Sequence, residues 1–340
     1  MVQVQARGNG NYQVSLKQTG LPCYNDGMTV SSFTHTVLYH GRCPDGLAAA
    51  WAVRKILGEN AEYVPMEYDT PAPNVTGRNV VIVDFSFKPM TMRILEEQAA
   101  RVVMLDHHAT AKDMLANYQC LCGSTHIQFD MDRSGAMMAW NHFHPGKEPP
   151  ALIHHIQDRD IWTWRDPLSM PFLRQLDTMP LTFETFDSVA SLDDAGYNAF
   201  VEKGKGLCEQ FNTMCMGFVG IAQPLQIDGI DGAQVSSSPY FTSDVGNMLA
   251  NKTGTFGCIW YVDKPGFIKV GLRSIDDTDV AAIATRFSGG GHKHAAAFRL
   301  PVERLAEIVS GKLLSPMYAA NVALGDVTNT TTSANFLSNV

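Results

Sequence analysis

Two apolar runs in the first half of the chain constrain the fold more than any other feature. Residues 80–83 (VVIV) and 102–105 (VVML) are apolar at every position and do not alternate with polar residues. Such strands are buried on both faces, which is typical of a parallel sheet that helices cover on both sides. Strand candidates lie at 34–40, 61–66, 79–85, 101–107 and 126–131, with helical patterns between most of them. This alternation predicts an α/β fold whose N-terminal part is a doubly wound, mainly parallel sheet.

The length of 340 residues is enough for two domains with separate cores. A mainly helical stretch follows the first domain, and then strand candidates at 218–223, 255–262 and 267–274 precede a helical pattern at 280–287. They predict a second, smaller α/β domain. The expected boundaries are an extension at 1–33, the first domain at 34–165, a helical linker at 166–216, the second domain at 217–310 and a low-complexity tail at 311–340.

The composition restricts the class of protein. The formal net charge of −8 argues against a nonspecific binder of long duplexes, which normally carries a strong basic bias. No run of eighteen apolar residues is present, so we expect no membrane span. The first residues lack the apolar core of a secretion signal, and the seven cysteines form no paired CxxC units. We therefore expect a cytoplasmic protein with reduced thiols.

Acidic and histidine residues follow several of the predicted strands. His40 and Asp45 follow the first, Asp84 closes VVIVD, and Asp106 begins the triplet Asp-His-His after VVML. One aspartate at such a place is more often a helix cap or a turn former. Several carboxylates at one sheet edge would repel one another unless a cation binds there. Oxygen ligands with one or two imidazoles suit Mn²⁺ or Mg²⁺, and six candidate ligands suit two metal ions.

Four motifs occur together with a glycine-rich segment. They are HGRCPDG, VDFSF, LDHHAT and IQDRDIW, and the C-terminal segment contains GGGHKHAAAF. With these motifs the chain resembles the DHH phosphoesterase superfamily with a C-terminal DHHA1 domain, over roughly residues 34–300. The segment FDMDRSGAMMAW, with Arg133 and Ser134, is similar to the family's serine-containing turn between a strand and a helix. A DHH triplet alone would be a weak signal, but the combination in the family's order is specific.

The resemblance implies a hydrolase with two Mn²⁺ ions in the N-terminal domain. Asp84 would bridge the ions, His108 would lie beside the scissile phosphate, and Asp84, Asp106 and His108 would form the catalytic set. A water molecule activated by the ions would be the nucleophile. Asp160 would orient Arg159 or a neighbouring ligand. The implied metal ligands are His40, Asp45, Asp84, Asp106, His107 and Asp158.

Cys43 departs from the family pattern, because it stands nearest to the place of a second aspartate in the first motif. A thiolate is a softer ligand than a carboxylate and would shift the metal preference toward zinc or iron. The alternative is that Cys43 packs behind the site. The GGGH segment departs only in having Ala297 where the family usually has glycine.

The second domain is expected to hold the substrate. Three glycines in a row allow backbone amides to approach an anion, and an arginine can bind a phosphate through two hydrogen bonds. Trp162 and Trp164 could stack on a base, but such residues more often belong to a core. The expected substrate-binding residues are Arg273, Ser274, Gly289, Gly290, Gly291, His292 and His294.

The function expected from this sequence is Mn²⁺-dependent hydrolysis of phosphate esters in short oligonucleotides, linear or cyclic dinucleotides, or nucleotides. Mg²⁺ or another transition metal could replace Mn²⁺, and a homodimer is a further expectation from the resemblance. One alternative is an inorganic pyrophosphatase or polyphosphatase, against which the GGGHKHAAAF segment counts. Another alternative is an inactive nucleotide-binding module.

Overall fold

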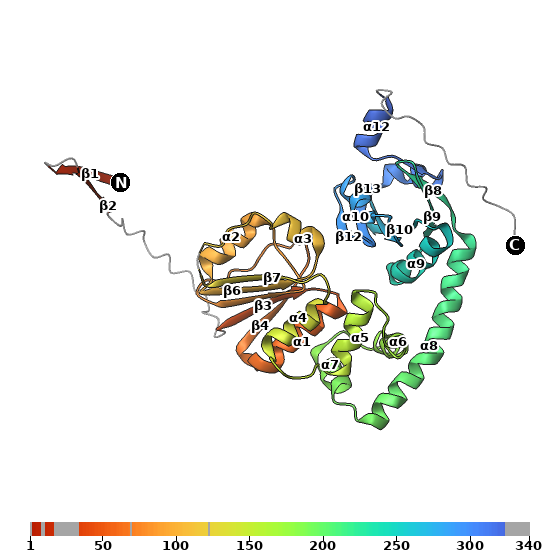
Figure 1. Cartoon of the computed structure of the whole chain (residues 1–340), viewed down its shortest axis with the longest axis horizontal. Helices are drawn as coiled ribbons and strands as arrows, with labels where there is room; N and C mark the ends of the chain where they lie inside the picture. Colours follow the sequence, from red (N-terminus) through yellow and green to blue (C-terminus); the bar gives the residue numbers. More distant parts are fainter. Residues whose placement is uncertain (1, 8–10, 17–33, 69, 122, 324–340) are drawn as a thin grey trace. The chain divides into compact units, whose positions relative to one another are not determined.

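The computed structural model describes residues 2–7, 11–16, 34–68, 70–121 and 123–323 (Figure 1). Residues 1–33 and 34–340 form two separate units. In the first unit, β1 (Val2–Arg7) pairs with β2 (Asn11–Leu16) in an antiparallel hairpin. The rest of the predicted extension, residues 17–33 included, and residues 324–340 of the predicted tail lie outside the described residues.

The second unit begins with a five-stranded parallel sheet, as the apolar runs predict. The order β4-β3-β5-β6-β7 reverses direction once, between β3 and β5. Each neighbouring pair is parallel. The doubly wound fold is therefore confirmed. The strands are β3 (His35–His40), β4 (Ala61–Met66), β5 (Asn79–Val83), β6 (Arg101–Asp106) and β7 (Thr125–Phe129).

Helices cover both faces of this sheet, which explains the unbroken apolar runs. Val81 and Val83 of β5 belong to a core cluster with α1 (Pro44–Leu57) and α4 (Gly135–Phe143). The alternate residues Val80 and Ile82 belong to the cluster that includes side chains of α2 (Pro89–Gln98). Figure 1 shows α1 and α4 on one face and α2 with α3 (Ala109–Met114) on the other. Helix α3 was not expected, because six residues are too few for a periodic pattern.

Four helices follow the sheet. The helices α5, α6 and α7 contribute Ile153, Phe172 and Phe186 to the core cluster of α1 and α4. The long helix α8 then leads to the second sheet. The bounds are α5 (Ala151–Asp160), α6 (Ser169–Leu176), α7 (Phe183–Ala190) and α8 (Asp194–Ile221).

The second sheet is seven-stranded and mixed, in the order β12-β13-β11-β10-β9-β8-β14. Alternate residues of β10 (Phe256–Lys264) face opposite cores. Ile259 packs with α8 and α9 (Thr242–Thr253), and Cys258 packs with α10 (Val280–Thr285). The expected strand at 218–223 is wrong, because these residues complete α8 and only Gln223 opens β8. The strands are β8 (Gln223–Ile227), β9 (Ile230–Ser236), β10 (Phe256–Lys264), β11 (Phe267–Ser274), β12 (Gly290–His292), β13 (Ala295–Pro301) and β14 (Lys312–Leu313). The helices are α9 (Thr242–Thr253), α10 (Val280–Thr285), α11 (Leu305–Val309) and α12 (Pro316–Ala323).

Candidate metal centre

Ligands of an open α/β sheet bind beyond the carboxyl ends of its strands, where the strand order reverses. In this sheet the reversal lies between β3 and β5. His40 ends β3, Asp84 directly follows β5, and Asp106 ends β6. The fold therefore brings the first three predicted motifs to one edge.

Histidine and aspartate side chains form overlapping clusters at this edge. His107 Nε2 lies 3.1 Å from Asp84 Oδ1, 3.3 Å from Asp160 Oδ2 and 3.9 Å from Asp45 Oδ2. On the other side of Asp84, its Oδ2 lies 3.4 Å from His40 Nδ1. Groups able to hold a metal ion are Asp45–Asp84–His107, His40–Asp84–His108 and His107–His108–His292.

Asp45 is fixed by the N-terminus of α4. Its Oδ2 accepts a hydrogen bond of 2.6 Å from the Gly135 amide, and its Oδ1 accepts one of 3.1 Å from the Ala136 amide. These contacts require close backbone approach. A Cβ atom at Gly135 would lie 2.4 Å from Asp84 Cβ, and one at Gly46 would lie 2.2 Å from the His40 carbonyl oxygen. Glycine at both positions therefore lets the first turns of α1 and α4 pack against the metal-centre residues.

Asp84 adopts a left-handed backbone conformation, with φ of 53°. This conformation is uncommon for a residue other than glycine and costs on the order of 1 kcal/mol or more. It occurs where β5 ends, and the Asp84 side chain is shared by two of the three clusters. The bridging role that the resemblance implies for Asp84 stays a prediction.

Asp106 has a different environment from Asp84. Its Oδ1 accepts hydrogen bonds from the His107 amide at 2.8 Å and from His108 Nδ1 at 2.7 Å. Its Oδ2 accepts a short hydrogen bond from Ser86 Oγ. The metal-binding groups found among the described residues do not include Asp106. Its contacts orient the two histidines of the triplet.

The structure corrects the choice between the two aspartates of IQDRDIW. Asp158 was the expected ligand, but its four hydrogen-bond donors lie in the following turn: the hydroxyls of Thr163 and Ser169 and the amides of residues 165 and 166. Asp160 instead contacts His107. Asp158 therefore organises the turn after α5, whereas Asp160 faces the candidate ligand His107. The metal-binding groups found among the described residues include neither aspartate.

The pKa values reflect crowded carboxylates. Burial and the charges of Asp160 and Asp84 raise the pKa of Asp45 well above its ordinary value. Burial would also raise the pKa of Asp84, but hydrogen bonding with His107 and the nearby His40 imidazole hold it well below the usual range. Burial would lower the pKa of His107, yet its bond to Asp84 and the neighbouring carboxylates raise it to about 10.

This donor set fits divalent cations. Asp84 Oδ2 and His40 Nδ1 are buried atoms without a hydrogen-bond partner. Buried polar atoms are rarely left so, because each unpaired group costs free energy. Carboxylate oxygens and imidazole nitrogens are the ligands that Mn²⁺ accepts, and a cation would offset the repulsion between Asp45, Asp84 and Asp160.

Cys43 lies at the start of α1, where it is partly buried and is not in a disulfide. Burial and the charges of Asp84, Asp160 and Asp45 raise the pKa of its thiol well above the ordinary value. The metal-binding groups among the described residues do not include it. Of the two alternatives for Cys43, this geometry favours packing behind the site.

The glycine-rich segment reaches the metal centre through His292. Its ring stacks on His108 at a centroid distance of 5.2 Å and lies 5.4 Å from the His107 ring. The segment forms the edge strand β12 and packs tightly on β13, because a Cβ at Gly289 would lie 2.2 Å from the Ala297 carbonyl oxygen. Gly291 has φ of 145° and faces the Ala295 carbonyl oxygen in the same way. Glycine is therefore required by the hairpin itself.

The remaining expected substrate-binding residues do not join His292. Arg273 donates to the Leu272 carbonyl oxygen and to Ser243 Oγ, both at 2.9 Å, and burial lowers its pKa to about 10. Ser274 Oγ lies 3.2 Å from the Nδ1 atom of the exposed His294. These three residues support the second sheet.

Residues of the strand-to-helix turn have structural contacts. Ser134 caps α4 by accepting a hydrogen bond from the Met137 amide, and exposed Arg133 pairs with Asp130 at 3.4 Å. Sequence reasoning missed Ser86 and Tyr68 as neighbours of the site. Ser86 stands inside VDFSF and could have been found there. Tyr68, whose ring meets His40 edge-on at 5.6 Å, had no signal.

The comparisons with known proteins define the class of the C-terminal part. Residues 241–311 match the DHHA1 domain. This confirms the recognition of the family: the chain carries a DHHA1 domain, preceded by a doubly wound α/β domain with the DHH-type motifs. DHH superfamily members are phosphoesterases.

Three individual matches are similar to this chain. An uncharacterized protein of Acanthamoeba polyphaga mimivirus is 28% identical over 324 residues, which cover 85% of this chain and 75% of that protein. RecJ from Thermus thermophilus, solved in complex with Mn²⁺, has a TM-score of 0.48 and 16% identity over 86% of this chain and 52% of RecJ. The pGpG-specific phosphodiesterase PggH from Vibrio cholerae has a TM-score of 0.43 and 12% identity over 86% of this chain and 99% of PggH. The chain thus spans about half the length of RecJ.

Among the residues that the structure describes, no helix is both long and apolar enough to cross a membrane.

Proposed function

We propose that this protein is a divalent-metal-dependent phosphoesterase that hydrolyses phosphate esters of short oligonucleotides, dinucleotides or nucleotides. The observation that carries the proposal is the cluster around Asp84, in which carboxylates and imidazoles converge and two buried atoms, Asp84 Oδ2 and His40 Nδ1, lie 3.4 Å apart and make no hydrogen bond. The DHHA1 match supports it, because this domain accompanies the DHH phosphoesterase core.

The side chains of this chain suggest a division of roles. His40, Asp45, Asp84, His107 and Asp160 would hold two ions, most simply Mn²⁺, with Asp84 between them. The bound ions would supply positive charge that acidifies a water molecule and offsets the charge of the phosphate. Asp106 is the positioning residue for His108, because it holds His108 Nδ1 and leaves Nε2 as the ring atom that can donate to a phosphate oxygen.

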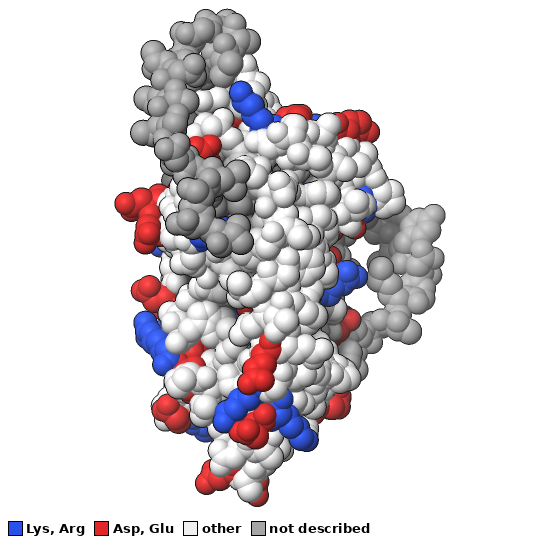
Figure 2. Space-filling model, turned by 90° about the vertical axis from the view of Figure 1, so that its right-hand side faces the viewer, with Lys and Arg blue, Asp and Glu red and all other residues white. Residues whose placement is uncertain are grey.

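A small substrate agrees with the surface and the charge. On the face shown in Figure 2, acidic and basic side chains are interspersed with broad uncharged areas. A protein that follows a long strand needs a continuous basic groove, and the net charge here is −8. His292 of β12 brings the second sheet to the metal centre, where it can contact the substrate beside His108.

The test is a substrate panel on the metal-stripped full chain, with Mn²⁺, Mg²⁺ or Zn²⁺ added back. Linear and cyclic dinucleotides, a nucleoside bisphosphate, a long oligonucleotide and pyrophosphate are compared. We expect metal-dependent release of nucleotides from short substrates and a loss of at least about 100-fold in Asp84→Asn and His107→Ala. The exposed Asp194→Asn serves as the matched control.

Two results would contradict the proposal. Hydrolysis of pyrophosphate without hydrolysis of dinucleotides would favour the pyrophosphatase alternative. Nucleotide binding without turnover under every metal would favour the inactive binding module.

A further inference from the structure

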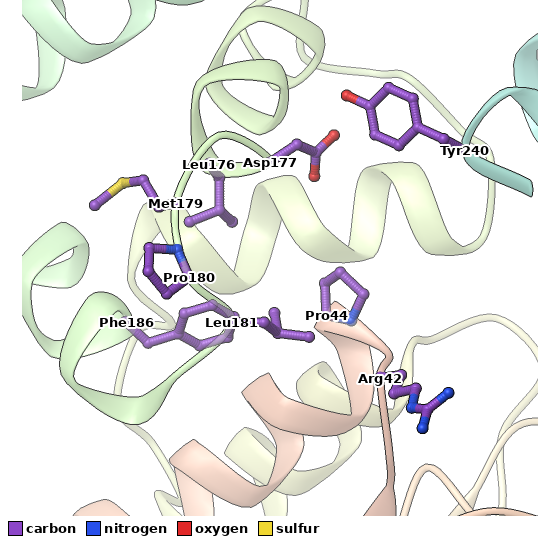
Figure 3. A pocket seen from close by; sticks show the side chains of 9 residues that line it. All are labelled: Arg42, Pro44, Leu176, Asp177, Met179, Pro180, Leu181, Phe186 and Tyr240. Carbon is purple, nitrogen blue, oxygen red and sulfur yellow. The ribbon is translucent and has the colours of Figure 1, made fainter. Parts of the chain in front are cut away.

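A small pocket adjoins the segment that carries the first metal-centre residues. It has a volume of about 180 Å³ (Figure 3). The residues that line it are Arg42, Pro44, Leu176, Asp177, Met179, Pro180, Leu181, Phe186 and Tyr240. This volume is below the range of roughly 300–1,000 Å³ that is typical of pockets for drug-sized ligands. The pocket therefore has room for a single ring system and not for a peptide or a lipid chain.

One side of the pocket is apolar. Leu176 and Phe186 are buried, and Leu181 is 41% exposed at the wall. Met179 and Pro180 complete this side, which lies opposite Arg42 and Tyr240 in the view of Figure 3. A flat ring with apolar faces can bury them there.

The other side carries three polar groups of different kinds. Arg42 is 88% exposed and pairs with Glu67, itself 54% exposed, so its guanidinium can exchange this partner for a phosphate. Asp177 pairs with Arg159 at 2.9 Å and with Arg174 at 3.5 Å, and the remaining lone pairs of its oxygens can only accept hydrogen bonds. Tyr240 is 51% exposed and presents an aromatic ring at the mouth.

Two pairs of neighbouring residues connect this pocket to the metal centre along the chain. Arg42 follows His40 by two residues, and Pro44 immediately precedes Asp45. Consecutive Cα atoms are about 3.8 Å apart, so both pocket residues lie within about 8 Å of a metal-centre residue, measured between Cα atoms. The second connection is through Arg159, which holds Asp177 and immediately precedes Asp160. The pocket and the metal centre are therefore built from neighbouring residues of the same chain segments.

We propose that this pocket binds the nucleobase of a nucleotide whose phosphate lies at the metal centre. The inference rests on the proposed function and names a specificity site for it. The base packs its faces between the apolar side and the Tyr240 ring, and Asp177 accepts a hydrogen bond from an exocyclic amino group. Arg42 contacts a phosphate or sugar at the exposed end.

The experiment uses Leu181→Trp, which fills the pocket, and Tyr240→Ala, which removes the aromatic wall. Leu192→Trp is the control, because Leu192 is 36% exposed and does not line the pocket. KM and kcat are measured for a dinucleotide and for its analogue that lacks one base. Calorimetry with GMP, AMP and ribose 5-phosphate reports binding without turnover.

We expect both pocket variants to raise KM for the dinucleotide, and the Kd for GMP and AMP, by roughly 5- to 100-fold. Values for the baseless analogue and for ribose 5-phosphate should stay within about 2-fold, and Leu192→Trp should match the wild type. Equal effects on ligands with and without a base, or wild-type GMP and AMP binding in both variants, would overturn the pocket assignment. Base-dependent binding without hydrolysis would instead sustain the pocket and refute the proposed function alone. Because the two variants alter different segments, misfolding of one, seen as lost circular dichroism, leaves the other as the test.

Discussion

Asp158 and Asp160 stand two residues apart on α5, and exchanging each for asparagine should give opposite results. In Asp158→Asn, an amide group replaces one oxygen and faces donors from the turn at 163–169, where the carboxylate accepts four hydrogen bonds. Hydrogen bonds to a charged group contribute about 1.5–3 kcal/mol each and are not additive. We therefore expect a loss of about 2–4 kcal/mol in the free energy of unfolding, which lowers the melting temperature by roughly 5–10 °C. Metal affinity should change little.

Asp160→Asn removes a negative charge that faces Asp45, Asp84 and His107. We expect the melting temperature of the metal-stripped protein to stay within a few degrees of the wild type, because the variant relieves repulsion while it loses a contact to His107. The Kd for Mn²⁺ should rise by at least about 100-fold, since even outer-shell changes weaken metal sites by about 10- to 100-fold.

Two measurements on the same samples decide between these outcomes: thermal melting in EDTA and calorimetric titration with Mn²⁺. The reasoning is refuted if Asp158→Asn abolishes Mn²⁺ binding without loss of stability while Asp160→Asn binds Mn²⁺ as the wild type does. That result would restore the ligand assignment expected from the sequence.

Three other predictions concern separate parts of the chain. Gly135→Ala places a Cβ 2.4 Å from Asp84 Cβ, so it should displace that side chain and weaken Mn²⁺ binding in calorimetry, whereas Gly206→Ala on α8, where a Cβ meets nothing within 4 Å, should leave binding unchanged. Burial would raise the pKa of Asp187, but hydrogen bonds and charges from donors on α1 lower this pKa. The Asp187 carboxylate therefore stabilises the fold at pH values above its unfolded pKa of about 3.9, and this stability is lost as the pH falls below that value. Asp187→Asn should flatten the decline of melting temperature between about pH 5 and pH 3. Arg174→Met leaves the partly buried Asp244 of α9 without its cation, whereas Asp177 keeps Arg159, and should cost about 3 kcal/mol in urea unfolding. An unchanged midpoint would show that the Arg174–Asp244 pair is dispensable.

The sheet could be predicted because its signal lies within each strand. Runs such as 80–83 are apolar on both faces, and no other part of the chain has to be known to read them. The error at 218–223 has the opposite origin. FVGIAQ is apolar enough for a short strand, but Val219 packs as the last buried turn of α8 against β9 and α9. The residues alone are compatible with a strand or a helix, and packing against the rest of the domain selects the helix.

The sequence predicts which residue types form the site, but not the direction in which each side chain points. Successive residues of an α-helix are rotated by about 100°, so residues two apart point about 200° away from each other. Only one of Asp158 and Asp160 can therefore face the sheet edge, and nothing in IQDRDIW tells which. The direction of the Arg273 side chain could not be predicted either. This residue lies on β11, and its side chain points toward Ser243 of α9.

Several departures from the local rules of protein structure lie together at one edge of the first sheet, and others occur elsewhere among the described residues. At this edge Asp84 and Arg42 adopt left-handed backbone conformations, Gly135 brings α4 against Asp84, and buried carboxylates lie beside two buried atoms that make no hydrogen bond. Each departure costs on the order of 1–3 kcal/mol, and a marginally stable chain tolerates several of them only where something offsets the cost. Bound divalent cations would offset both the charge repulsion and the cost of the atoms without hydrogen bonds, because carboxylate oxygens and imidazole nitrogens are ligands for such ions. A tight turn that only strains the backbone would explain the left-handed residues but not the buried carboxylates beside them. Bound cations account for both the strained backbone and the clustered carboxylates.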